Sequence, residues 1–114
     1  MTGIDDVRNE FKIANQNEVE ACLGRHPRLI EHLLDCIPII KKHLPETISL
    51  HLKHQDLGFT DGDLTICILL PGEVGAVPAR QRLALIDNEW WMKMPIEERM
   101  FLMADVRWNL MDDR

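Results

Sequence analysis

The stretch Arg28–Lys53, RLIEHLLDCIPIIKKHLPETISLHLK, decides the fold because a helical period changes to a strand period within it. In its first part, apolar residues recur at the spacing of one helix face: Ile30, Leu33, Leu34, Ile37, Ile40 and Leu44. Pro27 suits the first turn of this helix, Pro45 ends it, and Pro38 inside it predicts a kink or a split. From Thr47 to Lys53 apolar and polar residues alternate, which predicts a half-buried strand.

Downstream, residues 64–70 form a more continuously apolar run, which predicts a second strand. The polar segment 54–62 is turn-forming, so we expect the two strands to pair as an antiparallel hairpin. Pro78 can then open a helix with one apolar face, made by Ala79, Leu83, Ile86 and Trp90.

The last segment has two interpretations. Residues 100–110 alternate as a strand does, whereas Ile96, Met100, Met103 and Leu110 also suit one face of a helix. We prefer a short turn over 95–98 and a strand over 100–108, because a final strand lets the preceding helix return to the sheet.

Two short helices are predicted upstream, at 4–14 and at 18–23, the second with Asn17 as N-cap and Gly24 as stop. The chain is therefore expected to form a single α+β domain over residues 1–114. N-terminal helices precede a β-β-α-β unit, whose small three-stranded, mostly antiparallel sheet is covered by helices on one face. A right-handed crossover would leave the first strand central, in the order 2-1-3.

Composition limits the classes of function. The chain has 114 residues, 46% of them hydrophobic and 28% charged, with a formal net charge of -6. An acidic surface repels phosphate backbones, so we expect no nucleic-acid partner; the charge suits solubility or a partner with a basic patch. The start of the chain has no apolar leader segment, and no apolar run is long enough for a membrane helix. The interpretation is a cytoplasmic protein.

The five histidines and three cysteines give no metal or catalytic signature. Cys22, Cys36 and Cys67 are odd in number, widely spaced and next to apolar residues, so we expect small packed side chains rather than a zinc site or disulfides. His32 and His43 lie off the apolar stripe of the long helix and are expected to be solvated, and His26 to shape a helix entry. No catalytic residue, cofactor site or metal site is predicted.

The segment from His51 to Asp63 is the alternative candidate for a small enzyme or a ligand- or metal-binding domain. It holds His51, His54, Asp56, Asp61 and Asp63. Residues three apart on a strand face opposite sides, so one ion cannot easily take both histidines. Aspartates next to glycine usually serve the turn itself.

Asp87-Asn88-Glu89-Trp90-Trp91 and the later run Leu102–Trp108 carry a family resemblance. The chain resembles, over roughly residues 17–108, a group of short bacterial proteins of unknown function with an Asp/Glu-Glu-Trp-Trp run at a helix end and a closing strand. This chain has Asn88 where the group usually has an acid. Some members look like partners encoded beside toxin-like nucleases, so the resemblance implies an antitoxin-like role.

Trp90 and Trp91 are the candidate interface residues. Neighbours on a helix point about 100° apart, so we expect one of them in the core and the other partly exposed. An exposed aromatic is a frequent interface anchor. The sequence thus predicts a small acidic, non-catalytic protein-interaction or regulatory module that binds another protein or a second copy of itself.

Overall fold

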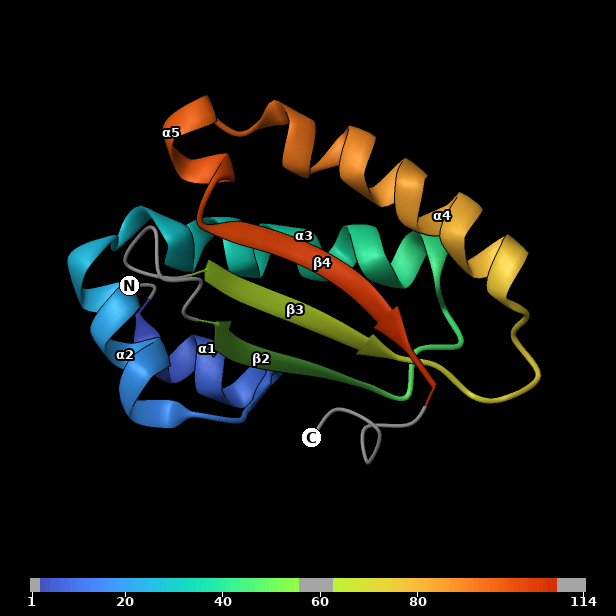
Figure 1. Cartoon of the computed structure of the whole chain (residues 1–114), viewed down its shortest axis with the longest axis horizontal. Helices are drawn as coiled ribbons and strands as arrows, with labels where there is room; N and C mark the ends of the chain where they lie inside the picture. Colours follow the sequence, from blue (N-terminus) through green and yellow to red (C-terminus); the bar gives the residue numbers. More distant parts are fainter. Residues whose placement is uncertain (1–2, 56–62, 109–114) are drawn as a thin grey trace.

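The computed structural model describes residues 3–55 and 63–108 (Figure 1). The elements, in chain order, are α1 (Ile4–Glu10), β1 (Lys12–Ile13), α2 (Gln16–Arg25), α3 (Arg28–His43), β2 (Ser49–Gln55), β3 (Asp63–Leu69), α4 (Ala76–Glu89), the 3-10 turn η1 (Trp91–Lys93), α5 (Ile96–Arg99) and β4 (Leu102–Arg107). Within the described residues, no helix is both long enough and apolar enough to cross a bilayer.

The four strands form one mixed sheet in the order β1-β2-β3-β4. The predicted hairpin is confirmed, because β2 and β3 pair antiparallel from Ser49–Leu69 to Gln55–Asp63. The other two pairs, β1 with β2 and β3 with β4, are parallel. The predicted sheet of three mostly antiparallel strands is therefore wrong, and so is the order 2-1-3: the second strand of the hairpin is central. The right-handed crossover rule fixes the hand of a connection, not which neighbour the returning strand joins.

β3 is central because its residues are apolar on both faces. Leu64, Ile66 and Ile68 are buried on the face that also carries Leu50 and Leu52 of β2. Thr65 and Cys67 on the other face are also only 2% exposed. A continuous apolar run is typical of a strand buried on both sides, whereas the alternation in β2 suits a strand nearer the edge. β4 follows α4 back to the free side of β3.

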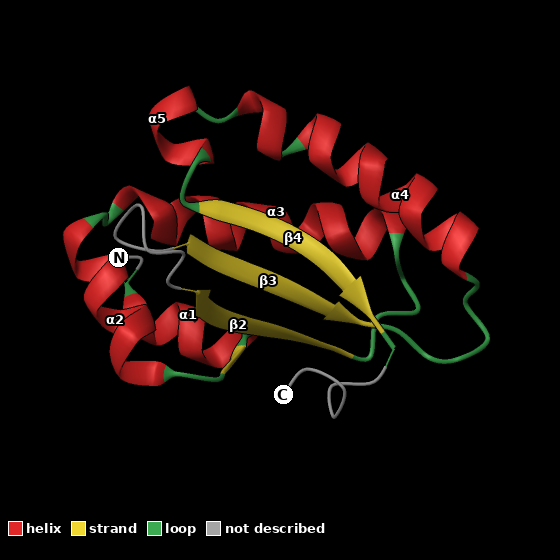
Figure 2. Cartoon of the chain, viewed as in Figure 1, coloured by secondary structure: helices red, strands yellow, loops and turns green. Residues whose placement is uncertain are grey.

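Helices α3 and α4 cover the apolar face. In Figure 2 the strands face the viewer and α3 runs behind them. Pro38 does not split α3, which continues from Arg28 to His43. Pro38 is exposed, so the Leu34 carbonyl that loses its helical partner lies toward water and costs little. Arg82 on α4 donates two bonds to the Glu46 carboxylate, at 3.0 and 2.9 Å, and so fixes α4 against the segment after α3.

The N-terminal elements differ from the prediction in detail. α2 begins at Gln16 and contains Gly24, so neither Asn17 nor Gly24 marks an end. The preceding Asn15 does not cap the helix with its side chain; its amide instead bonds the backbone N–H and C=O of His54 at 2.9 and 2.8 Å. This clamp continues the pairing of the two-residue strand β1, which the sequence did not predict.

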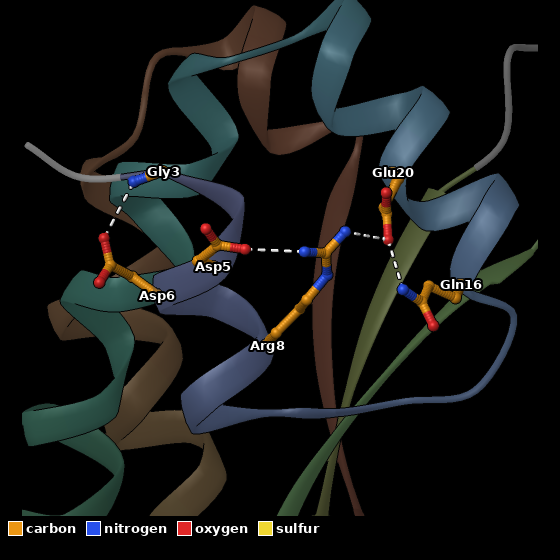
Figure 3. A network of polar contacts seen from close by, with 6 residues as sticks. All are labelled: Gly3, Asp5, Asp6, Arg8, Gln16 and Glu20. Atoms are coloured by element: carbon orange, nitrogen blue, oxygen red, sulfur yellow. Dashed lines mark hydrogen bonds and ion pairs between the residues drawn. The ribbon is translucent and has the colours of Figure 1, made fainter.

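Charged side chains join the first two helices (Figure 3). The Arg8 guanidinium donates to Asp5 at 2.7 Å and to Glu20 at 2.6 Å, and Gln16 donates to the same Glu20 oxygen at 2.6 Å. Asp6 accepts the backbone N–H of Gly3 at 2.9 Å. Because the contacts of Arg8 and Gln16 with Glu20 are exposed, they orient α1 on α2 more than they stabilise the fold.

The central position of β3 predicts the cost of a cavity there. Ile66→Ala should lower the free energy of unfolding by about 2–5 kcal/mol, because Ile66 is fully buried between the sheet and the helices. Ile48→Ala is the matched control, since that side chain is 62% exposed, and it should change stability by no more than about 0.5 kcal/mol. Urea denaturation of both variants measures the difference; equal costs would contradict this account of the core.

Candidate functional site

The three tryptophans are fixed by hydrogen bonds from their indole N–H groups to backbone carbonyls. Trp90 donates to His32 of α3, Trp91 to Leu102 of β4 and Trp108 to Val74, each at 2.7 Å. Trp90 is buried in the core, whereas Trp91 is half-buried, as expected for two neighbours at the end of a helix. Whether either contacts a partner stays a prediction.

The chain reverses direction directly after this pair. α4 ends at Glu89, η1 turns the backbone, and Pro95 precedes the single-turn helix α5 that leads into β4. The predicted turn over 95–98 and closing strand are confirmed by α5 and β4. Trp91 thus lies at the corner where α4, α5 and β4 meet (Figure 1).

Four exposed apolar side chains belong to the segment that turns this corner and to the start of β4. Met92, Ile96, Met100 and Met103 are between 45% and 71% exposed, and they are four of the seven large hydrophobic side chains exposed in the described residues. With Trp91 they form what we call the C-terminal apolar surface. Arg99 lies within it: its guanidinium carbon is 5.5 Å from the Trp91 ring centroid, and one of its nitrogens is 3.8 Å from Met92 Sδ.

A notch of about 170 Å³ opens beside Trp91, lined by Asp87, Trp91, Met103 and Ala104. Asp87 belongs to the last turn of α4 and Trp91 to η1, and both side chains line the notch. Burial raises the pKa of the Asp87 carboxyl above its ordinary value. The hydrogen bonds and ion pairs of the described residues include none to this carboxylate.

Two histidine–glutamate pairs hold the corner against α3. His32 Nε2 is 2.9 Å from Glu98 Oε1 of α5, and His43 Nε2 is 2.9 Å from Glu89 Oε2 of α4. Lys42 adds a contact of 3.1 Å to the same Glu89 carboxylate, and these partners keep the pKa of Glu89 below its ordinary value. The prediction that His32 and His43 are solvated is therefore wrong; both are partly buried because α4 and α5 fold back onto α3.

Larger hollows lie elsewhere. One of about 440 Å³ lies between the end of α3 and the start of β2, where Ile48 is exposed. Another, of about 410 Å³, lies at the α2–α3 corner beneath His26, which stacks on Phe101 with ring centroids 4.3 Å apart. Neither hollow is lined by Trp91 or by another residue of the C-terminal apolar surface.

The alternative segment from His51 to Asp63 is divided by the sheet. His51 and His54 are three residues apart on β2 and so point to opposite faces, as the sequence predicts. Asp56 and Asp61 lie outside the described residues, as does the side chain of Asp63. Among the residues that the structure does describe, no group of three histidine, cysteine or acidic side chains could hold a metal ion.

The sheet does bring together residues that are distant in sequence. Lys12, His51, Cys67 and Asp105 form one row across the four strands. His51 Nε2 lies 2.8 Å from Ser49 Oγ, and burial, with Lys12 second, lowers the pKa of His51. Cys67 is only 2% exposed, so a substrate has no access to its sulfur. Cys36 is also buried, and burial raises the pKa of its thiol far above the ordinary value, so this thiol is unreactive.

Comparison with known proteins gives no match to a family model, to a curated protein or to a solved structure. The resemblance to the short bacterial proteins therefore stays a prediction, and the site rests on its geometry.

The sequence did not single out Asp87 or the exposed methionines. The available signal for Asp87 was its spacing of four residues from Trp91 at the end of an amphipathic helix. Met103 had a signal too, because in the strand interpretation it alternates with Leu102 and Ala104 and points away from the core.

Asp87→Asn should stabilise the protein at pH 7. A carboxyl whose folded-state pKa is raised holds its proton more tightly in the folded chain, so wild-type stability falls as pH rises through the interval above the ordinary value of 3.8. The stability that Asp87→Asn gains over wild type should be complete above the folded-state pKa of Asp87 and absent below pH 3.8. Thermal melts between pH 3 and pH 8 measure it. Glu46→Gln is the control and should lower the melting temperature at pH 7, because Arg82 lowers the pKa of Glu46 in the folded chain. A lower melting temperature for Asp87→Asn at pH 7 would contradict the prediction.

Proposed function

We propose that this chain is a non-catalytic protein-binding module, and that it docks through the C-terminal apolar surface. The observation that carries the proposal is the concentration of exposed apolar side chains within residues 91–103, around the half-buried Trp91. Scattered apolar side chains are normal on a protein surface, but a cluster around a fixed aromatic is typical of an interaction site.

The composition of the surface suits a docking role. Three of its five residues are methionines, whose flexible thioethers adapt to different partner shapes. Trp91 supplies a rigid, amphipathic anchor at the centre. Such a surface combines one preformed contact with adaptable ones around it.

The platform beneath the surface is rigid, which lowers the entropy cost of binding. The Trp91 indole is bonded to Leu102, and Arg99 Nε donates to the Met94 carbonyl at 3.0 Å. Glu98 joins α5 to His32 on the long helix. A partner therefore meets side chains whose backbone is already ordered.

The edge of the sheet is less suited to binding than this corner. β4 is an edge strand, but two of its backbone groups already have side-chain partners. The Trp91 indole N–H donates to the Leu102 carbonyl, and the Asp105 carboxylate accepts the N–H of Val106 at 2.8 Å. Side chains that occupy edge groups hinder pairing with another strand. Docking by side chains is favoured over the addition of a strand.

The partner class follows from charge. With a net charge of -6, the chain suits a partner with a basic surface. The resemblance to the short bacterial proteins implies an antitoxin-like role, which also requires a protein partner. A second copy of the chain is the alternative binding partner for the C-terminal apolar surface. The mass of the recovered complex would distinguish a dimer from a complex with another protein.

The double variant Ile96→Lys, Met100→Lys tests the docking surface. Both side chains are exposed, so the variant should fold as wild type does, while two buried charges at the interface should weaken partner binding by at least about tenfold. The measurement is native mass spectrometry of tagged protein recovered from its source cells.

Val77→Lys, Leu85→Lys is the matched control, since these side chains are exposed on α4, outside the C-terminal apolar surface. The same stoichiometric partner, or dimer, should accompany wild type and control and be lost from the test variant. Equal recovery with all three proteins would show that another surface carries the binding.

A further inference from the structure

The notch beside Trp91 holds a carboxylate, whose presence hydrophobic contact does not explain. Asp87 is a carboxylate among an indole, a thioether and a methyl group, those of Trp91, Met103 and Ala104. A charged group that is partly withdrawn from water normally has an ionic or hydrogen-bonded partner. Within the described residues no such contact to Asp87 occurs, and burial raises its pKa.

The chain has a cation close by, but that cation is already used. Arg99 donates through Nε to the Met94 carbonyl and lies over the Trp91 ring. No ion pair between Arg99 and Asp87 occurs in the described part of the chain. Among the described residues the carboxylate therefore has no cation, and it can pair with a group from outside.

We propose that the partner inserts an arginine side chain into this notch, where its guanidinium pairs with the Asp87 carboxylate and its flat face lies against Trp91. The inference rests on the proposed function and names the partner's central residue. The notch adjoins Trp91 and Met103 of the apolar surface, so the arginine would be surrounded by apolar contacts that exclude water.

Three properties favour arginine over lysine. A guanidinium is planar and can donate two parallel hydrogen bonds to one carboxylate. It can lie over an aromatic ring, as the Arg99 guanidinium lies over Trp91 at 5.5 Å from the centroid. It is also less strongly hydrated than an ammonium group, so it enters an apolar notch at a lower cost. The notch is lined by both a carboxylate, that of Asp87, and an indole, that of Trp91, which matches both contacts.

The test is a titration of the ¹⁵N-labelled full chain with N-acetyl-arginine amide, followed by the indole N–H resonances of the three tryptophans. The Trp91 resonance, assigned with Trp91→Phe, should shift and saturate at millimolar concentrations, while those of Trp90 and Trp108 stay fixed. Asp87→Asn should weaken the response at least tenfold. Asp35→Asn, which removes an exposed carboxylate on α3, should leave it unchanged. N-acetyl-lysine amide should bind more weakly than the arginine compound.

The absence of a Trp91 shift, or an equal response in Asp87→Asn, would overturn the inference, and equal binding of the two amides would overturn the choice of arginine. Because the titration needs no partner, its failure leaves the docking surface to be judged by the Ile96→Lys, Met100→Lys variant. Loss of the partner from that variant with no amide response would mean that the surface docks without an arginine.

Discussion

The pairing of β3 on both sides is the constraint on which the rest of the structure depends. β3 has seven register pairs with β2 and six with β4. A strand that is apolar on both faces must be central, because only there do neighbours shield its two edges and its side chains. Once β3 is central, β4 has to return beside it, and α4 has to lie next to α3 on the apolar face.

The candidate site follows from that return path. The chain leaves α4 on the apolar face and enters β4 at the far end of β3, so residues 90–101 have to turn through a tight corner. Trp90 fills the inside of the corner and bonds to α3, while Trp91 closes its outside and bonds to β4. Met94 also packs in the core, whereas Met92, Ile96 and Met100 stay exposed and form most of the C-terminal apolar surface.

Stability and binding have opposite requirements at this corner. The two histidine–glutamate pairs and the indole bonds stabilise it, whereas the half-buried Asp87 carboxylate destabilises it at neutral pH. A group that costs stability in the free protein and gains a partner in a complex is typical of a binding site. The exposed methionines fit the same pattern, since they contribute little to the core.

The sequence by itself determined most of the elements. The helical stripe after Arg28, the alternation after Thr47, the apolar run from Leu64 and the proline before Ile96 each act locally through backbone preference and side-chain period, so their helices and strands could be predicted. The parallel neighbours of the two hairpin strands, the two-residue strand β1 and the partners of His32 and His43 could not be, because they depend on contacts between residues 38 to 66 positions apart. The same holds for the site. The sequence indicated that one tryptophan of the pair is partly exposed. Only the folding of β4 against α4 brings Met103 and Ala104 to Asp87, whose carboxylate has no partner among the described residues.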